Sequence, residues 1–241
     1  MVHASNMEIT YNTKDCADFV RSAYIKGYSS GKIKSRDDKE PNWFHCARVA
    51  DTLEILLGKY NEGSQEERQA IVLGAIGHDL LEDVEVSEQE IQGLFGELAL
   101  QHIKGMTRKG QDFNTKDYHA YSQKLAGSSE EVRLIKLSDL YDNYASPIYR
   151  LLNMVVQDVT DAKQKKHTEE YNNTRLKFLK TILGPILDVQ FEAVKKTVFS
   201  KYPKIAQDLI SKVEDAQMLY GRELERKAND NLYSTLLFAV K

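Results

Sequence analysis

Helix signals recur along the whole chain, and no part of it shows a succession of short alternating strands. Only four prolines occur in 241 residues, so few positions forbid a continuous helix. Capping boxes, in which a serine is followed three residues later by a glutamate, introduce several stretches; they are Ser64 with Glu67, Ser87 with Glu90, and Ser128 with Glu131. These patterns predict an all-α fold.

The same signals bound the individual helices. We expect helices over residues 15–28 and from Pro41 to Gly58. After Ser64, the segment QAIVLGAIGHDLLED is apolar enough to form one buried helix. Later helices are expected to break before Pro147, at Gly184-Pro185 and around Tyr202-Pro203.

Composition and charge exclude several classes of protein. Apolar residues make up 41% and charged residues 29% of the chain, as in ordinary globular proteins. A net charge of -3 gives no overall basic field for binding nucleic acid. No apolar run approaches the roughly 18 to 20 residues of a membrane span, and the start MVHASNMEIT lacks the features of a signal peptide. Cys16 and Cys46 form no disulfide or metal-type pattern, so we expect a cytoplasmic protein with reduced thiols. Together with the charge and the lack of a membrane span, this predicts no nucleic-acid or membrane partner.

A His-Asp dipeptide ends the most apolar predicted helix. His78 and Asp79 follow AIVLGAI, where burying two ionisable groups is costly unless they are paired or bind a metal. On the dipeptide alone, a solvent-exposed pair at a helix end is an equally good interpretation. The ordered set of His45, His78-Asp79 and Asp139 favours a metal site, because two imidazoles and two carboxylates suit Mn²⁺, Fe²⁺, Mg²⁺ or Zn²⁺.

Acidic residues follow the dipeptide. Glu82 lies four residues after His78, so in a continuous helix its carboxylate projects from the same face. A carboxylate there could position a metal-bound water and move its proton. Asp83 comes next, and the alternative is that both acids merely lead into a polar loop.

Polar residues also accompany Asp139. Asn143 lies one turn after Asp139 and Lys136 nearly one turn before it, so the three share a helical face. Asn143 could hydrogen-bond a ligand. Lys136 could bind a substrate or pair with Asp139 itself.

Four segments together resemble the hydrolase domain of the RelA/SpoT homologues, in particular the stand-alone small alarmone hydrolases. RDDKEPNWFH is similar to the family's segment of an arginine, a Gly-Glu-Pro turn and the first metal histidine, and GHDLLEDV to its HDxxED motif. FGELALQHIKGMTRK and IKLSDLYDN are similar to its FG…GVTK and IKLADRxxN segments. The resemblance runs from about Cys16 to Ser146 and implies an HD-domain helical bundle with additional C-terminal helices. Asp37, Asn42-Trp43-Phe44 and Leu140 differ from the family's pattern.

The resemblance also implies a site and a reaction. It makes His45, His78, Asp79 and Asp139 the ligands of one divalent metal ion, for which Mn²⁺ is the first choice. It makes Glu82 and Asp83 the catalytic acidic pair. It brings Arg36, Asn143 and Ser146 to the nucleotide, and the shared helical face adds Lys136 to the substrate-binding group. The family removes pyrophosphate from the 3′ position of (p)ppGpp, and metazoan members are associated with removal of the 2′-phosphate of NADPH.

These observations lead to one principal expectation. Residues 1–149 are predicted to form a hydrolase core, and residues 150–241 a helical extension that packs on it or forms a homodimer surface. The expected function is metal-dependent hydrolysis of a small-molecule nucleotide, in the manner of a (p)ppGpp 3′-pyrophosphohydrolase. The alternatives are an HD nucleotidase, an NADPH phosphatase-like enzyme, and a non-catalytic nucleotide sensor that keeps the metal as a structural staple.

Overall fold

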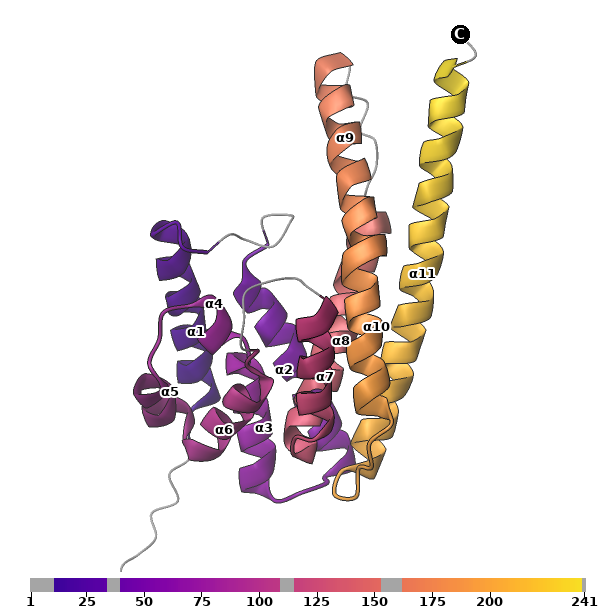
Figure 1. Ribbon diagram of the computed structural model, residues 1–241. Coiled ribbons are helices and arrows are strands. Elements are labelled where there is room, and N and C mark those ends of the chain that lie inside the picture. The colour runs from indigo at the N-terminus through magenta and orange to yellow at the C-terminus, as the bar shows by residue number, and fades with distance from the viewer. Residues whose placement is uncertain (1–10, 34–39, 109–114, 153–161, 240–241) are drawn as a thin grey trace, which may run out of the picture. The chain divides into compact units, whose positions relative to one another are not determined.

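A computed structural model of the protein describes residues 11–33, 40–108, 115–152 and 162–239. All regular secondary structure in these residues is helical, which confirms the predicted fold class (Figure 1). The chain divides into two compact units, Met1–Arg108 and Lys109–Lys241. The expected organisation, a hydrolase core over residues 1–149 followed by a helical extension, stays a prediction. No described helix is both long and apolar enough to cross a membrane.

The first unit has α3 at its centre. This helix contacts α1, α2, α5 and α6, so it is enclosed by neighbours (Figure 1). Residues 70–77 of α3 are all buried, as the continuous apolar run AIVLGAIG requires. The described helices of this unit are α1 (Thr13–Ser29), α2 (Asn42–Tyr60), α3 (Gln65–Gly77), α4 (Leu80–Asp83), α5 (Glu88–Phe95) and α6 (Glu97–Met106).

Two predicted capping boxes are present in this unit. The Ser64 hydroxyl accepts from the Glu67 N–H at 3.2 Å, and the Glu67 carboxylate accepts from the Ser64 N–H at 2.9 Å. Ser87 and Glu90 make the same pair of bonds at the start of α5. Each box satisfies N–H groups that have no partner within the helix, so both helices begin where the pattern predicts.

The helix expected to continue through the His-Asp dipeptide is instead interrupted there. α3 ends at Gly77, and the short α4 begins at Leu80. A Cβ atom on Gly77 would lie 2.7 Å from Ile103 and 3.1 Å from Phe95, so the chain approaches its neighbours closely at this point. The expectation that Glu82 shares a face with His78 required a continuous helix, so helical spacing does not relate these two residues here.

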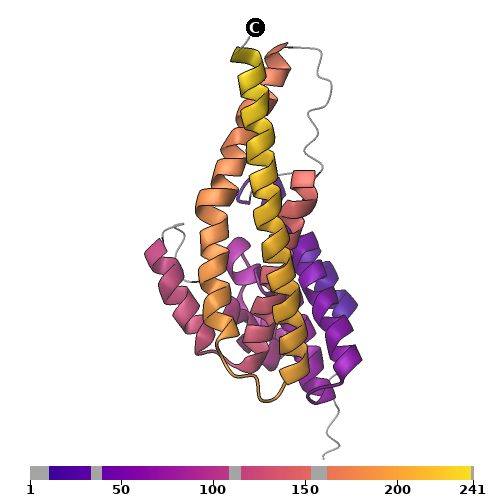
Figure 2. The same cartoon turned by 90° about the vertical axis from the view of Figure 1, so that its right-hand side faces the viewer.

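The second unit is built around α8 and α11, which pack against each other, while α10 packs on α7 and α8 (Figure 2). We expected a helix to end at Gly184-Pro185. Instead, a π-helical turn, η1, joins α9 to α10, and the chain stays helical through these two residues. Its described helices are α7 (Thr115–Ala126), α8 (Glu130–Leu152), α9 (Ala162–Phe178), η1 (Leu179–Leu183), α10 (Gly184–Lys195) and α11 (Pro203–Ala239).

Two expectations for α8 are wrong. The hydroxyl that accepts at its start belongs to Ser129, which bonds the Val132 N–H at 3.4 Å, and not to Ser128. The helix also continues through Pro147 to Leu152. A proline removes one N–H from the helical ladder, and the burial of α8 against its neighbours outweighs that loss.

A part-buried polar cluster connects three helices of this unit. Asp188 of α10 accepts from the Tyr144 hydroxyl of α8 at 2.6 Å and from the Gln217 amide of α11 at 2.7 Å. Burial, together with the hydrogen bond to Asp188, raises the pKa of Tyr144 far above its ordinary value. The phenol therefore stays protonated and remains a donor.

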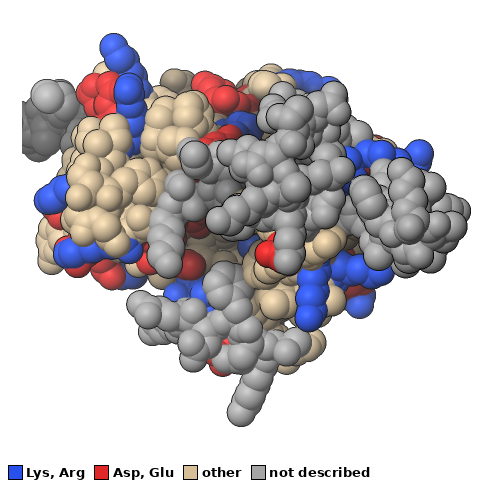
Figure 3. Space-filling model, turned by 90° about the horizontal axis from the view of Figure 1, so that it is seen from above, with Lys and Arg blue, Asp and Glu red and all other residues tan. Residues whose placement is uncertain are grey.

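Both signs of charge appear among the described side chains on the face drawn in Figure 3. Asp and Glu side chains lie among those of Lys and Arg on that face. This mixture agrees with the small net charge of -3. An anionic substrate would therefore be recognised by a few local groups and not by a field over the whole surface.

The capping box at Ser64 provides a test of the fold. Ser64→Ala removes the acceptor for the Glu67 N–H, so the free energy of unfolding should fall by about 0.5–2 kcal/mol. Ser22→Ala is the control, because the Ser22 hydroxyl only donates to the Asp18 carbonyl of its own helix. That variant should change stability by less than about 0.5 kcal/mol. Urea denaturation followed by circular dichroism measures both, and equal effects would contradict the assigned role of Ser64.

Candidate metal centre and active site

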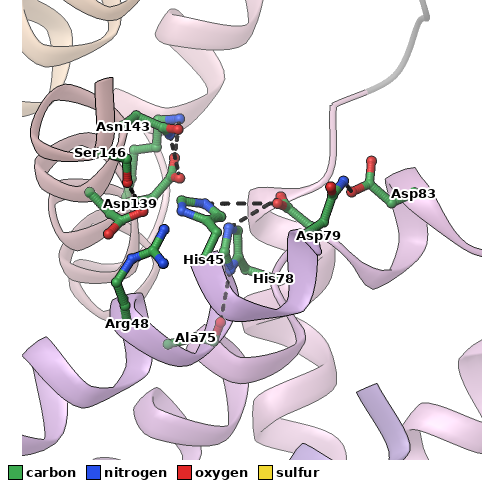
Figure 4. Close-up of polar contacts among 12 residues, drawn as sticks. His45, Arg48, Ala75, His78, Asp79, Asp83, Asp139, Asn143 and Ser146 are labelled. Atoms are coloured by element: carbon green, nitrogen blue, oxygen red, sulfur yellow. Dashed lines mark hydrogen bonds and ion pairs between the residues drawn. The ribbon is translucent and has the colours of Figure 1, made fainter. Parts of the chain in front are cut away.

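Three predicted ligands converge in the first unit. The side chains of His45, His78 and Asp79 point toward one another (Figure 4). Their ligand atoms all lie within 4.8 Å of one another. Asp79 Oδ1 is 3.2 Å from His78 Nε2, and Asp79 Oδ2 is 3.9 Å from His45 Nε2. The two imidazole side chains are 0% and 1% exposed, whereas that of Asp79 is 24% exposed, so the cluster is open to solvent only on its carboxylate side.

The local structure explains this convergence. His45 lies in the first turn of α2, on the side of that helix that packs against α3. His78 directly follows the last residue of α3, where Gly77 permits close packing against α5 and α6. Asp79 precedes α4, and its carbonyl accepts from the Asp83 N–H at 2.9 Å. The end of α3 therefore presents two ligands side by side.

A backbone carbonyl orients the imidazole of His78. Its Nδ1 lies 2.8 Å from the Ala75 carbonyl oxygen, which requires Nδ1 to carry the proton in the neutral ring. Nε2, the nitrogen beside Asp79, then has its lone pair available for a metal. Histidine ligands of metal ions are usually held in this way through their second nitrogen.

The donor set fits a divalent transition metal. Two imidazole nitrogens and a carboxylate oxygen are the ligand types that Zn²⁺, Mn²⁺ and Fe²⁺ accept. Burying two polar rings beside a carboxylate is costly in free energy, and a shared cation offsets that cost. His45, His78 and Asp79 therefore form a potential metal site.

The two predicted catalytic acids differ in their surroundings. Glu82 is exposed, and its Oε1 accepts a hydrogen bond from the Arg108 N–H. Asp83 is half-buried, and its Oδ2 accepts from the Tyr24 hydroxyl at 2.8 Å and from Asn42 Nδ2 at 3.1 Å. The sequence singled out Glu82 by its spacing from His78, but it gave no sign of the hydrogen bonds that hold Asp83.

Tyr24 and Asn42 were not predicted as members of the site. Tyr24 is fully buried on α1, on the same face as Cys16 and Val20. Burial and the neighbouring acidic groups Cys46, Asp79 and Asp83 raise the pKa of Tyr24 well above its ordinary value. The available signal was a tyrosine at an apolar helix position, because a buried hydroxyl needs a partner.

The remaining predicted residues with described side chains lie on α8 of the second unit. Asp139 accepts from Lys136 Nζ at 2.7 Å and from Asn143 Nδ2 at 2.6 Å, so these three share one helical face as predicted. Lys136 therefore makes the ion pair that was its alternative role. Ser146 donates to Asp142 Oδ2 at 3.0 Å. Arg36 lies outside the described residues.

No protein-family model matches the chain. A curated relative, the guanosine-3′,5′-bis(diphosphate) 3′-pyrophosphohydrolase of Aquifex aeolicus (strain VF5), is 32% identical over 130 residues. That match covers 53% of this chain but only 17% of the relative. The chain thus corresponds to about a sixth of the relative's length.

A solved structure matches over more of the chain. It is a metazoan ortholog of SpoT, described as hydrolysing ppGpp and acting in starvation responses. The match covers 84% of this chain and 97% of the ortholog, with a TM-score of 0.52 and 15% sequence identity. The chain has a SpoT-type fold. Both comparisons confirm the resemblance predicted from the four motif segments.

Metal analysis tests the potential metal site of His45, His78 and Asp79. The purified protein should bind about one divalent ion per chain, because the predicted ligands make one mononuclear set. His78→Ala should abolish binding, because it removes a buried ligand beside Asp79. His119→Ala, an exposed position on α7, is the control and should keep wild-type binding.

Elemental analysis and calorimetric titration with Mn²⁺ provide the measurements. Loss of metal in His119→Ala, His102→Ala or His167→Ala, with binding kept in His78→Ala, would overturn the ligand assignment.

Proposed function

We propose that this protein is a metal-dependent phosphohydrolase of nucleotides, with guanosine 3′,5′-bis(diphosphate) as the first substrate candidate. The observation that carries the proposal is the cluster of two buried histidines, His45 and His78, with the partly exposed Asp79, whose ligand atoms lie within 4.8 Å of one another. The relative's 3′-pyrophosphohydrolase activity and the ppGpp hydrolysis by the SpoT ortholog support the choice of substrate.

The proposed metal is Mn²⁺, with Fe²⁺, Zn²⁺ and Mg²⁺ as alternatives. Asp139 is the proposed fourth ligand, on the strength of its place in the IKLSDLYDN motif. When bound, such an ion polarises a phosphoryl oxygen and lowers the pKa of a water. A mixed nitrogen and oxygen set of this kind leaves positions open for water and substrate.

Two acidic residues, Glu82 and Asp83, are proposed to accept the proton of the attacking water and to orient that water. Glu82 is exposed and follows the His-Asp dipeptide, so its carboxylate can accept a proton from water as the water attacks phosphorus. Asp83, held by two donors to one oxygen, orients that water. A bond forms between phosphorus and the water oxygen while the bond between phosphorus and the 3′ oxygen breaks, and the proton accepted by Glu82 passes to that oxygen, so the products are pyrophosphate and the 3′ hydroxyl.

Cationic and polar residues are proposed to hold the nucleotide. Arg36 contributes a guanidinium suited to a phosphate or a base. Asn143 and Ser146 offer an amide and a hydroxyl on α8, one turn apart from their partners Asp139 and Asp142. Lys136 is the remaining candidate, and in this arrangement its charge also balances Asp139.

A substrate panel tests the proposed function. The Mn²⁺-loaded protein should release pyrophosphate from ppGpp faster than phosphate from NADPH or from a nucleoside monophosphate. His78→Ala should be inactive on every substrate. Preferred release of phosphate from NADPH or a monophosphate would reassign the substrate to the phosphatase or nucleotidase alternative. No turnover by metal-loaded protein that still binds ppGpp would indicate the non-catalytic sensor.

The role of Glu82 has a separate test. Glu82→Gln keeps the size of the side chain but removes its basicity, so kcat should fall by about 10²- to 10⁴-fold with metal content unchanged. Glu85→Gln is the matched control, because Glu85 is also exposed and pairs with Lys32 at 2.5 Å. It should keep wild-type kcat. Metal loss in Glu82→Gln would make Glu82 a ligand, and full activity would remove it from catalysis.

A further inference from the structure

Asp83 is held by a pair of hydrogen bonds that the proposed reaction does not itself require. The Tyr24 hydroxyl donates to Asp83 Oδ2 at 2.8 Å, across 59 positions of the sequence. Asn42 Nδ2 donates to the same oxygen at 3.1 Å. Two donors on one carboxylate oxygen hold that oxygen in place and fix the plane of the carboxylate.

The donors are themselves fixed. Tyr24 has no exposed surface, so its ring is held by packing within α1 and its neighbours. The Asn42 N–H donates to the Tyr28 hydroxyl at 2.6 Å, and that hydroxyl donates to Asn42 Oδ1 at 3.2 Å. Tyr24 and Tyr28 are one turn apart on α1, so a single helix holds both Asp83 and its second donor.

This arrangement connects Asp83 to the metal cluster. Asn42 is the first residue of α2, and His45 follows three residues later in the same turn. The Asp83 carboxylate is therefore held against the turn of α2 that carries a predicted ligand. Glu82, by contrast, is exposed and bonds a backbone N–H after α6.

We propose that Tyr24 is a positioning residue of the active site, which acts by fixing the orientation of the Asp83 carboxylate. This inference rests on the proposed function, since it concerns the turnover of that same site. Tyr24 acts through Asp83 and is not itself a group that handles the proton. A rigid carboxylate speeds the chemical step by holding its partner in the reactive geometry.

Tyr24→Phe provides the test, because it removes the hydroxyl and keeps the buried ring. With Mn²⁺-loaded protein and ppGpp, we expect kcat to fall about ten- to a hundredfold, with KM and bound metal unchanged. Asn42→Ala removes the second donor and should also lower kcat. Tyr220→Phe is the matched control: its buried hydroxyl donates to the Leu179 carbonyl at 2.8 Å, so it should lose stability and keep wild-type kcat.

A double-mutant cycle separates positioning from a purely structural role. In the Asp83→Asn background, Tyr24→Phe should have no further effect on kcat, because its partner has already been altered. Additive losses, or a loss of kcat matched by the Tyr220→Phe control, would overturn the inference. Wild-type kcat in Tyr24→Phe would also overturn it while leaving the proposed function intact. An inactive wild type with metal bound would instead overturn the proposed function, and this inference with it.

Discussion

Burial of two imidazole rings beside one carboxylate is the constraint on which the first unit depends. A polar ring without a partner in a protein interior costs several kcal/mol of free energy, roughly 2–7 by transfer scales. The chain meets this cost for His78 with the Ala75 carbonyl, and it brings Asp79 within 3.2 Å of the opposite nitrogen. α3 ends at Gly77, so His78 and Asp79 lie between this helix and α4. The interruption is thus a feature of the site and not a defect in the helix.

The same interruption separates the roles of two adjacent acids. Since α4 starts afresh after Asp79, Glu82 faces solvent while Asp83 turns toward α1 and the start of α2. An exposed carboxylate can exchange protons with water, whereas a carboxylate with two fixed donors on one oxygen is oriented but less mobile. These surroundings support the proposed roles, proton transfer by Glu82 and orientation of water by Asp83. Chemically similar neighbours often acquire different functions through their environments in this way.

The second unit shows how α8 can carry a polar face and remain rigid. Lys136, Asp139 and Asn143 form one bonded row on this helix. Tyr144 points to Asp188, which also binds Gln217. Asp188 and Gln217 belong to α10 and α11, which lie in the sequence region expected to be an extension. These helices therefore support the helix that bears the IKLSDLYDN motif, a contribution for which the sequence held no local signal.

The sequence by itself determined the helical class, two of the three predicted capping boxes, and the candidate residues His45, His78, Asp79 and Asp139. These follow from local rules: apolar periodicity, the reach of a serine hydroxyl over one turn, and the ligand chemistry of imidazole and carboxylate. Tertiary structure alone decided where α3 ends, that α8 passes through Pro147, and which helix holds Asp83. Each of these depends on contacts between residues distant in sequence, such as Gly77 with Ile103 and Tyr24 with Asp83. At these points tertiary packing outweighs the local preference for a helix. A close contact or a buried hydrogen bond contributes more free energy than the helix propensity of a single residue.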